Sequence, residues 1–515
     1  MLLDIRPDHL RMVLDILQKH VPQYEVWAFG SRAKWTAKDY SDLDLCVVSN
    51  QPLNFPLLGA LAEDFSDSDL PWKVDVVDWA TVSESFRKII ARDKVVVQKA
   101  GMSEWSTARV AQVATINSEA IGRDWPYSHV SYIDISSVGE GQMEAPPQRL
   151  NIADAPSRAK RLVRKGDTVI STVRPNRRSM FFVSNPSDDW VVSTGFAVLR
   201  PNTTKIDPRY LYTCIFNQTF TEYLIGREKG AAYPAVSPED IGNAEIALPP
   251  LEKQRAIAHI LGTLDDKIEL NRRMNETLEA IARAIFKSWF VDFDPVRAKA
   301  SGEAPESICR RLGLTPDLLA LFPDRLVDSE LGEIPEGWDV RSIGEVIERL
   351  SVGKKYEQKT VNPTGNIPVL DQGRSGIIGY HDDEPGVIAS GDNPVVVFAN
   401  HTCYMRLINF SFSAIQNVLP FVGKGVATIW VFYATLGKQL FIEYKGHWPD
   451  FVIHKLAVPD SKLTNEFSKT VHALLKLVWN LEQEAATLAI LRDTLLPKLL
   501  SGELRVPDAE KALEA

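Results

Sequence analysis

The segment GSRAKWTAKDYSDLDL, residues 30–45, combines a Gly-Ser pair with two aspartates two residues apart. Asp42 and Asp44 precede an apolar run, and residues two apart on a strand point to the same face. Paired carboxylates hold Mg²⁺, which takes hard oxygen ligands and also binds substrate phosphates. A turn at Gly30–Ser31 lets backbone N–H groups approach those phosphates closely. The segment therefore predicts the chemistry of nucleotidyl transfer.

Short strands must position these groups. The preceding segment, YEVWAFGS, alternates in the manner of a short, mostly buried strand and ends at the Gly-Ser turn. A further strand, KVDVVDW, offers Asp75 among valines. A third carboxylate can complete a metal site or accept the proton of an attacking hydroxyl. The alternative is a strand end with solvated acids, and both the spacing and the third strand argue against it.

This stretch resembles the minimal nucleotidyltransferases of the DNA polymerase beta-like superfamily, over about residues 1–100. The family pattern is Gly-Ser, ten residues, Asp-x-Asp and a later Asp on a third strand, matched here by Gly30, Ser31, Asp42, Asp44 and Asp75. The resemblance implies that Asp42 and Asp44 bind metal, that Asp75 is catalytic, and that Mg²⁺ and ATP are the cofactors. Trp35 stands where many relatives carry Gly, which bears on the shape of the loop. A catalytically idle domain that serves as a binding module is the alternative.

Composition limits the class of protein. A chain of 515 residues suggests three or more domains, and 45% hydrophobic with 24% charged residues is ordinary for a globular protein. The net charge of −9 argues against coating nucleic acid wholesale, but a local basic face is compatible with it. No apolar run approaches a membrane span, the N-terminus reads as a charged amphipathic helix, and the four cysteines form no CxxC pair. We expect a cytoplasmic protein without a membrane partner.

Two heptad seams recur 210 residues apart. The first runs from Leu261 to Trp289 and the second from Val471 to Leu499, with steps of three and four throughout. Two polar residues of the first seam, Asn271 and Asn275, are expected to set its register. The repeat predicts two long helices that pair antiparallel. Two unrelated core helices are the alternative, which nine positions in step argue against.

The predicted fold class is α/β multidomain: an N-terminal α/β nucleotidyltransferase fold, then two mixed α/β domains, each followed by a long helix. The strand-like runs are broken by Gly, Pro, Asn and Asp, and each mixed domain opens on a tryptophan, SEW and PEGW. The predicted boundaries are 1–100, 104–248 for the first mixed domain, 249–293 for its helix, 294–336 for a linker, 337–458 for the second mixed domain and 459–506 for the second helix.

The segments ALPPLEKQRAIAHIL, AIFKSWFVDFDPVRAKASGE, SELGEIPEGW and LLPKLLSGELRV look like the specificity subunit of type I restriction-modification systems. This resemblance spans about residues 104–506. It implies two target-recognition domains, each reading half of a split site in double-stranded DNA, with no catalysis in this portion. It also implies methyltransferase and motor-nuclease partners. The second helix entry, AVPDSKLTNEF, lacks the PPLEKQ of the first, which bears on where that helix begins.

A basic run supplies the candidate DNA contacts. Residues 157–180 hold eight Lys and Arg and one acid. Arginines bind phosphates and read guanine edges in the major groove. A solvated basic face is the alternative for any one of them. The candidates are Lys160, Arg161, Arg174, Arg177 and Arg178 in the first domain and, as weaker ones, Lys354, Lys355 and Arg374 in the second.

Two functions follow from these patterns. The first is a DNA-binding specificity subunit with an accessory nucleotidyltransferase domain, favoured because its resemblance covers most of the chain. The second is an enzyme that transfers AMP to a protein and is localised by a DNA-reading module. Minimal nucleotidyltransferases often act on a helical toxin partner, so the resemblance permits such a partner here.

Overall fold

The computed structural model describes residues 3–22, 24–38, 40–49, 52–98, 105–122, 124–230, 234–373 and 376–514. The chain divides into two compact units, Met1–Gly262 with Thr494–Ala515, and Thr263–Asp493. Arg374, a candidate DNA contact, lies outside the described residues. Among the described residues, no helix is both long and apolar enough to cross a membrane.

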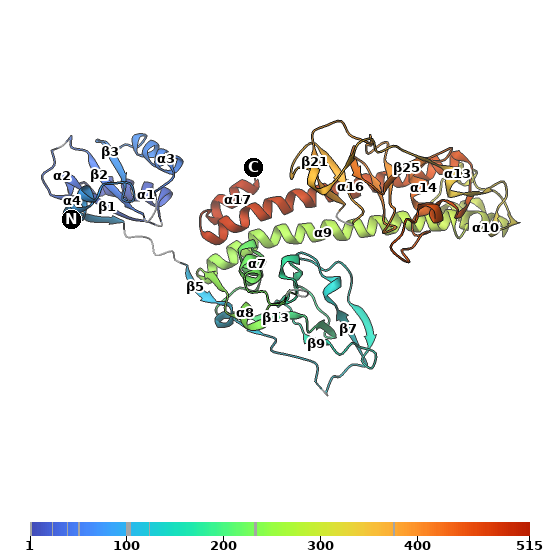
Figure 1. The fold of residues 1–515 in the computed structure, drawn as a ribbon, viewed down its shortest axis with the longest axis horizontal. Coiled ribbons are helices and arrows are strands. Elements are labelled where there is room, and N and C mark those ends of the chain that lie inside the picture. The colour runs from blue at the N-terminus through green and yellow to red at the C-terminus, as the bar shows by residue number, and fades with distance from the viewer. Residues whose placement is uncertain are drawn as a thin grey trace. The chain divides into compact units, whose positions relative to one another are not determined.

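The N-terminal domain is a four-stranded sheet of order β3-β2-β1-β4, with helices on both faces (Figure 1). Side chains of α1 and α3 cover one face through a core that includes Leu17 and Leu61, and α4 covers the other through Ile90. The parallel pair β2–β3 requires a crossover, which α3 supplies. The elements are α1 (Pro7–His20), β1 (Glu25–Phe29), α2 (Gly30–Ala33), β2 (Leu43–Val48), α3 (Phe55–Ser66), β3 (Val74–Asp78), α4 (Glu84–Asp93) and β4 (Val95–Gln98).

The first strand-rich domain, residues 105–248, contains two four-stranded sheets, β11-β10-β13-β6 and β8-β7-β12-β9. Val169 and Val198 of the first sheet pack with Ile133 and Val192 of the second in one buried cluster. A third pair, β5 with β14, joins the two ends of the domain. The strands are β5 (Ser106–Arg109), β6 (Ala114–Ile116), β7 (His129–Ile133), β8 (Gln148–Asn151), β9 (Ala159–Leu162), β10 (Thr168–Ser171), β11 (Met180–Phe182), β12 (Trp190–Ser193), β13 (Phe196–Pro201) and β14 (Glu245–Leu248). The α-helices are α5 (Val110–Val113), α6 (Pro208–Phe216), α7 (Gln218–Ile225) and α8 (Pro238–Gly242).

The second strand-rich domain, residues 339–458, repeats this plan with sheets β18-β25-β22-β23 and β19-β24-β20-β21 and a closing pair β17–β26. By order and direction, β6, β13, β10 and β11 correspond to β18, β25, β22 and β23. The strands are β17 (Asp339–Ser342), β18 (Ile347–Arg349), β19 (Lys355–Tyr356), β20 (Ile367–Leu370), β21 (Ile377–His381), β22 (Val395–Ala399), β23 (Met405–Ile408), β24 (Ser413–Ile415), β25 (Val418–Gly423) and β26 (Lys455–Val458). The helices are α13 (Ile343–Val346), α14 (Thr428–Thr435) and α15 (Trp448–Val452).

The fourth strand of the second sheet differs between the two domains. In the first domain it is β9, which follows β8 in sequence and runs antiparallel to β12. In the second it is β19, which precedes β20 and runs parallel to β24. The same place beside the central strand is therefore filled by segments of different origin and opposite direction.

The two predicted long helices are α9 (Leu251–Phe290) and α16 (Ser461–Ser501), each followed by shorter elements. Within the second unit they pair antiparallel, because Asp265 contacts Arg492, Asn271 contacts Glu484, and Phe286 packs against Phe467. Rising numbers on one helix meet falling numbers on the other, which confirms the prediction.

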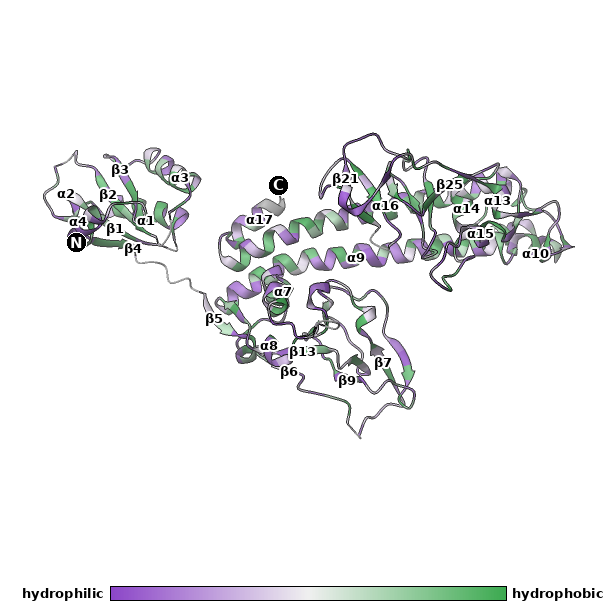
Figure 2. Cartoon of the chain, viewed as in Figure 1, coloured by the Kyte–Doolittle hydropathy of each residue, from purple (hydrophilic) through white to green (hydrophobic). Residues whose placement is uncertain are grey.

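Polar contacts interrupt the apolar seam between α9 and α16, and Figure 2 shows both helices as mixtures of hydrophobic and hydrophilic residues. Asn271 is completely buried, and its Nδ2 donates to Glu484 Oε2 at 2.8 Å. Arg492 Nη1 lies 2.9 Å from Asp265 Oδ1, and only 13% of the Arg492 side chain is exposed. Contacts of this kind exist in one register only and so fix how the helices align.

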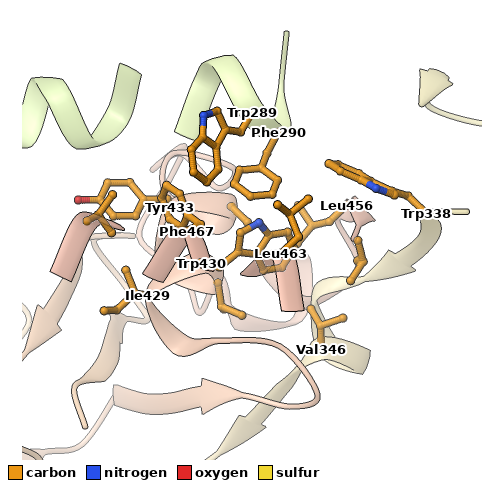
Figure 3. Close-up of a cluster of buried hydrophobic side chains, with 14 of the residues drawn as sticks. Trp289, Phe290, Trp338, Val346, Ile429, Trp430, Tyr433, Leu456, Leu463 and Phe467 are labelled. Carbon is orange, nitrogen blue, oxygen red and sulfur yellow. The ribbon is translucent and has the colours of Figure 1, made fainter. Parts of the chain in front are cut away.

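Residues 294–336, predicted as a linker, fold into short elements. They are α10 (Asp294–Ala300), α11 (Pro305–Leu312), α12 (Pro316–Leu319), β15 (Leu326–Ser329) and β16 (Gly332–Pro335); a last helix, α17 (Val506–Glu514), follows α16. Each of the three helices has a proline in its first turn, where the missing N–H costs nothing. Phe322 of this segment packs on Trp289, which belongs to an aromatic cluster with Phe290, Trp430 and Phe467 (Figure 3).

Candidate functional site

The predicted carboxylates come together at one end of the N-terminal sheet. The parallel register of β2 and β3 places Asp44 opposite Asp75, and Asp42 directly precedes β2. On the other side, the antiparallel register of β1 places Phe29 opposite Asp44, so that Gly30 and Ser31, the first residues of α2, follow at the same end. Hydrogen bonding between three adjacent strands thus assembles the predicted site.

Gly30 is required by its contact with Asp44. Its φ of +77° is a conformation that residues with a side chain rarely adopt. A Cβ at this position would lie 2.1 Å from Asp44 Oδ2, well inside contact distance. The glycine therefore allows the carboxylate to lie directly against the backbone of the turn.

The acids repel one another in the absence of a cation. The pKa of Asp44 is raised, first by burial and then by the charges of Asp75 and Asp42. The Lys73 ammonium lies 2.5 Å from Asp75 Oδ1, and this hydrogen bond raises the pKa of Lys73. A divalent cation among the three carboxylates would relieve the same repulsion more completely.

The residues fit a metal that arrives with its substrate. Among the described residues, no three His, Cys, Asp or Glu side chains converge closely enough to hold an ion alone. Mg²⁺ is usually bound by one or two carboxylates, with waters and substrate phosphates completing its shell. Asp42, Asp44 and Asp75 suit that shared arrangement better than a permanent metal cage.

Arg32 is a positioning residue that the sequence patterns did not single out. Only 6% exposed, it donates from Nε and Nη2 to the carbonyl of Ser41, at 2.8 and 2.6 Å, immediately before Asp42. Its Nη1 also donates to the backbone carbonyl of Asp4, and the guanidinium lies 4.5 Å from the Trp72 ring centroid. Arg32 thus ties both ends of the loop that joins the Gly-Ser turn to the acidic strand. Its position directly after the Gly-Ser pair was the feature of the sequence that could have identified Arg32.

The loop between these ends contains Trp35, at the position where the resembling family often has Gly. Trp35 has a φ of +57° and is 57% exposed. The loop therefore keeps the left-handed turn that glycine favours and places a tryptophan in it, at a cost of about 1–2 kcal/mol.

The structure divides the basic run of the first strand-rich domain. Arg158 pairs with Asp134, Arg164 with Glu119 and Arg178 with Glu140, all acids from outside the run. Three cations of the run are exposed and have no carboxylate partner among the described residues. They are Lys160, Lys165 and Arg177.

The five candidate residues of this run fall on two separate elements. Lys160 and Arg161 lie on β9, where Arg161 is partly buried and burial lowers its pKa. Arg174, Arg177 and Arg178 lie on the turn between β10 and β11. Arg178 belongs to the protein interior: its Nη2 donates to the Phe216 carbonyl at 2.5 Å, and its guanidinium lies 4.8 Å from that residue's ring centroid. The backbone N–H of Arg174 donates to the Pro234 carbonyl.

In the second strand-rich domain, Lys354 pairs with Asp383 at 2.7 Å and lies over the Tyr356 ring. Lys355 lies on β19, exposed and without a carboxylate partner in the part of the chain that the structure describes. The basic pairs Lys160–Arg161 and Lys354–Lys355 therefore occupy or adjoin the corresponding fourth strands, β9 and β19. The counterpart of the β10–β11 turn is the β22–β23 turn, residues 400–404, where the sequence patterns indicated nothing.

The N-terminal domain thus has the sheet and acid triad of a nucleotidyltransferase, and the rest of the chain is a duplicated unit of strand-rich domain and long helix. Residues 10–98 match the family described as nucleotidyltransferase domain, and residues 102–280 match the type I restriction modification DNA specificity domain. The chain therefore combines a type I restriction modification DNA specificity domain with an N-terminal nucleotidyltransferase domain.

Two sequence relatives match the two regions separately. The probable protein adenylyltransferase MntA of Haemophilus influenzae is 57% identical over 97 residues, which are 85% of that protein and 19% of this chain. The type I restriction enzyme HindI specificity subunit of the same organism is 27% identical over 428 residues, 90% of that protein and 69% of this chain. The type I S subunit from M. genitalium aligns in structure with a TM-score of 0.45 and 14% identity, over 96% of that chain and 77% of this one.

Proposed function

We propose that this chain reads a split site in double-stranded DNA for a type I restriction-modification complex, and that it carries methyltransferase and motor-nuclease partners. The observation that carries the proposal is the duplication: two domains of matching topology, each followed by a helix, with the helices paired antiparallel. Each domain binds one half-site, and the half-sites differ because the two domains present different residues.

Sequencing of DNA methylation in cells with and without this gene tests the proposal. The expected result is a methylated motif of two unlike halves separated by unspecified bases, present only with the gene and its methyltransferase partner. Exchanging residues 339–458 for the corresponding domain of a relative should change one half and leave the other. A continuous motif, or none, contradicts the proposal.

The helix pair is proposed to set the spacing between the halves. Inserting four residues into the middle of α9, and four matching residues into α16, lengthens each helix by about 6 Å. Because four residues are close to one helical turn, the seam is approximately preserved. The spacer should then grow by about one or two base pairs with both halves unchanged. An altered half with the old spacer contradicts the role of the helices.

For the N-terminal domain we propose transfer of AMP from ATP to a hydroxyl of a protein acceptor: the hydroxyl oxygen bonds to the α-phosphorus, the α–β phosphoanhydride bond breaks, and pyrophosphate leaves. Asp42 and Asp44 would hold Mg²⁺, which neutralises the phosphate charge that develops during transfer. Asp75 lies beside Asp44, where it can accept the proton of the attacking hydroxyl. The turn at Gly30–Ser31 presents backbone N–H groups to the phosphates, and Arg32 holds the loop that carries Asp42.

Labelling with radioactive ATP tests this activity in the full chain. The double variant Asp42→Ala, Asp44→Ala should abolish labelling of any acceptor while DNA binding stays unchanged. The candidate acceptors are a helical toxin partner encoded nearby and the subunits of the complex itself. If the wild type binds no nucleoside triphosphate, the domain is an idle binding module.

The alternative function is a transferase whose DNA-reading part only localises it. The resemblance of the N-terminal domain to a protein adenylyltransferase favours considering it. It predicts that AMP transfer proceeds with or without DNA and that no methylation motif depends on the gene. The methylation experiment above separates the two functions.

A further inference from the structure

An exposed apolar loop follows α14 in the second strand-rich domain. Residues 437–446 join α14 to α15, and they contain four large apolar side chains with high exposure. Their exposed fractions are 69% for Leu440, 55% for Phe441, 75% for Ile442 and 81% for Tyr444. So many exposed apolar side chains within five residues of an otherwise ordinary surface indicate a binding site.

The protein holds this loop in a defined conformation. Asn400, at the start of the β22–β23 turn, accepts hydrogen bonds from the His447 and Trp448 N–H groups at 2.9 and 2.8 Å. His447 is completely buried, with its Nε2 3.0 Å from the Glu443 carbonyl oxygen. The Tyr444 ring packs on His401, 4.8 Å between centroids. The apolar side chains are therefore presented on a loop that is fixed at its C-terminal end.

The corresponding loop of the first domain lies against the basic β10–β11 turn. There the Arg174 N–H donates to the Pro234 carbonyl, and the Val236 N–H donates to the Thr172 carbonyl. Both domains thus attach the loop before the last short helix to the turn that follows the same strand, β10 or β22. In the first domain that turn carries Arg174, Arg177 and Arg178, whereas residues 400–404 of the second carry no Lys or Arg.

We propose that loop 437–446 is the base-reading element of the second domain and that Leu440 and Ile442 contact thymine methyl groups in the major groove. The inference rests on the proposed DNA-reading function. DNA is favoured over a protein because the loop is hydrogen-bonded to the β22–β23 turn, whose counterpart in the first domain, the β10–β11 turn, is basic. The ammonium of Lys438, at the foot of the loop, is exposed and has no carboxylate partner among the described residues. Apolar side chains recognise the C5-methyl of thymine, whereas arginine recognises guanine.

Deoxyuridine substitution tests the proposal, because it removes the thymine methyl and leaves base pairing intact. The probes are duplexes that carry the methylated motif, with the thymines of one half at a time replaced by deoxyuridine. With the wild-type chain and its methyltransferase partner, a duplex substituted in one half should bind about fourfold more weakly for each methyl removed. A duplex substituted in the other half should bind with unchanged affinity. The double variant Leu440→Ala, Ile442→Ala should bind both kinds of duplex equally.

Ile388 provides a matched control, since it is 82% exposed and lies between β21 and β22. Ile388→Ala should keep the full sensitivity to deoxyuridine. The proposal is overturned if the loop variant remains as sensitive to deoxyuridine as the wild type. It is also overturned if the half-site read by the second strand-rich domain contains no thymine. A loop variant that binds DNA normally but no longer retains the methyltransferase reassigns the loop to a protein partner and also overturns it. If the wild-type chain has no motif at all, the proposed function itself fails.

Discussion

The acidic site of the N-terminal domain and the basic run of the first strand-rich domain were both predicted from residue types at close spacing, but the fold treats them differently. The acids Asp42, Asp44 and Asp75 stay together, and burial, reinforced by the charges of Asp75 and Asp42, raises the pKa of Asp44. The basic run is broken up, because acids from residues 119–140 neutralise Arg158, Arg164 and Arg178.

The difference lies in what determines each arrangement. Asp44 lies on β2 and Asp42 directly precedes that strand, and pairing with β3 fixes Asp75 beside Asp44, so short-range geometry is sufficient. A charged run gives no information about acids that approach from other strands. The net charge of a run in sequence therefore overestimates the charge that a ligand meets. A motif on paired strands, in contrast, predicts correctly which side chains lie together.

The largest expected effect comes from Gly30→Ala. The added Cβ meets Asp44 Oδ2 and imposes a strained backbone, so the carboxylate must move. We expect ATP labelling to fall by about 100-fold or more, since small displacements of reacting groups have effects of that size. Gly59→Ala is the control, because Gly59 lies in α3 and its Cβ would meet nothing within 4 Å. Equal labelling by both variants would contradict the proposed importance of the close contact between Gly30 and Asp44.

Arg178 and Arg177 separate structural from DNA-binding cations within one turn. Arg178→Ala removes a mostly buried guanidinium, its pairing with the exposed Glu140 and its hydrogen bond to the Phe216 carbonyl, and should destabilise the first strand-rich domain by about 2 kcal/mol, measured by hydrogen exchange. Arg177→Ala should change stability by less than about 0.5 kcal/mol and lower the salt dependence of DNA binding by about one unit of slope. The reverse pattern would mean that Arg178 faces DNA.

Asp44→Asn should make the stability of the N-terminal domain less sensitive to pH. Because burial and neighbouring charges raise the pKa of Asp44, the folded domain holds this proton more tightly than the unfolded chain. The wild type should therefore lose stability relative to the variant as the pH rises from about 4 to 7 in EDTA. With Mg²⁺ and ATP present the order should reverse. An unchanged difference across that range would show that the pKa of Asp44 is not raised in the folded domain.

The smallest expected effect is that of Trp35→Gly. It relieves the left-handed strain at Trp35 and adds freedom to the unfolded chain, so the net gain should be about 1 kcal/mol or less. Hydrogen exchange of peptides from β1 and β2 measures it. A loss of stability would mean that the exposed indole makes a contact worth more than the strain.

Periodicity predicted the long-range plan of the chain well. The seams at Leu261–Trp289 and Val471–Leu499 lie within α9 and α16, and their antiparallel pairing follows from cross-helix contacts such as Asn271 with Glu484. The residues of the motif Gly30 to Asp44 lie together at one end of the N-terminal sheet, and their roles in metal and nucleotide binding stay a prediction. Both signals depend on local geometry that a sequence states directly.

Other features depend on tertiary contacts that no local pattern encodes. The proline-rich segment 294–336 read as a linker, but its prolines begin helices, and Phe322 packs into the core. The head of Arg492, a residue of the second seam, binds Asp265 on the other helix. The β22–β23 turn became a candidate only because its strand is the counterpart of β10. Its residues carry no charge pattern that could have indicated a site.

The interchangeable fourth strand, β9 in one domain and β19 in the other, has an evolutionary consequence. This position in the sheet accepts a parallel or an antiparallel strand, and the strand comes early in the domain sequence in one case and later in the other. It therefore places few constraints on the segment that occupies it. Insertions, deletions and transplanted segments can enter there while the β10–β13 or β22–β25 framework keeps its hydrogen bonds. Such a framework suits rapid diversification of the segment beside it, because the sequence of that segment can change while the rest of the fold stays the same.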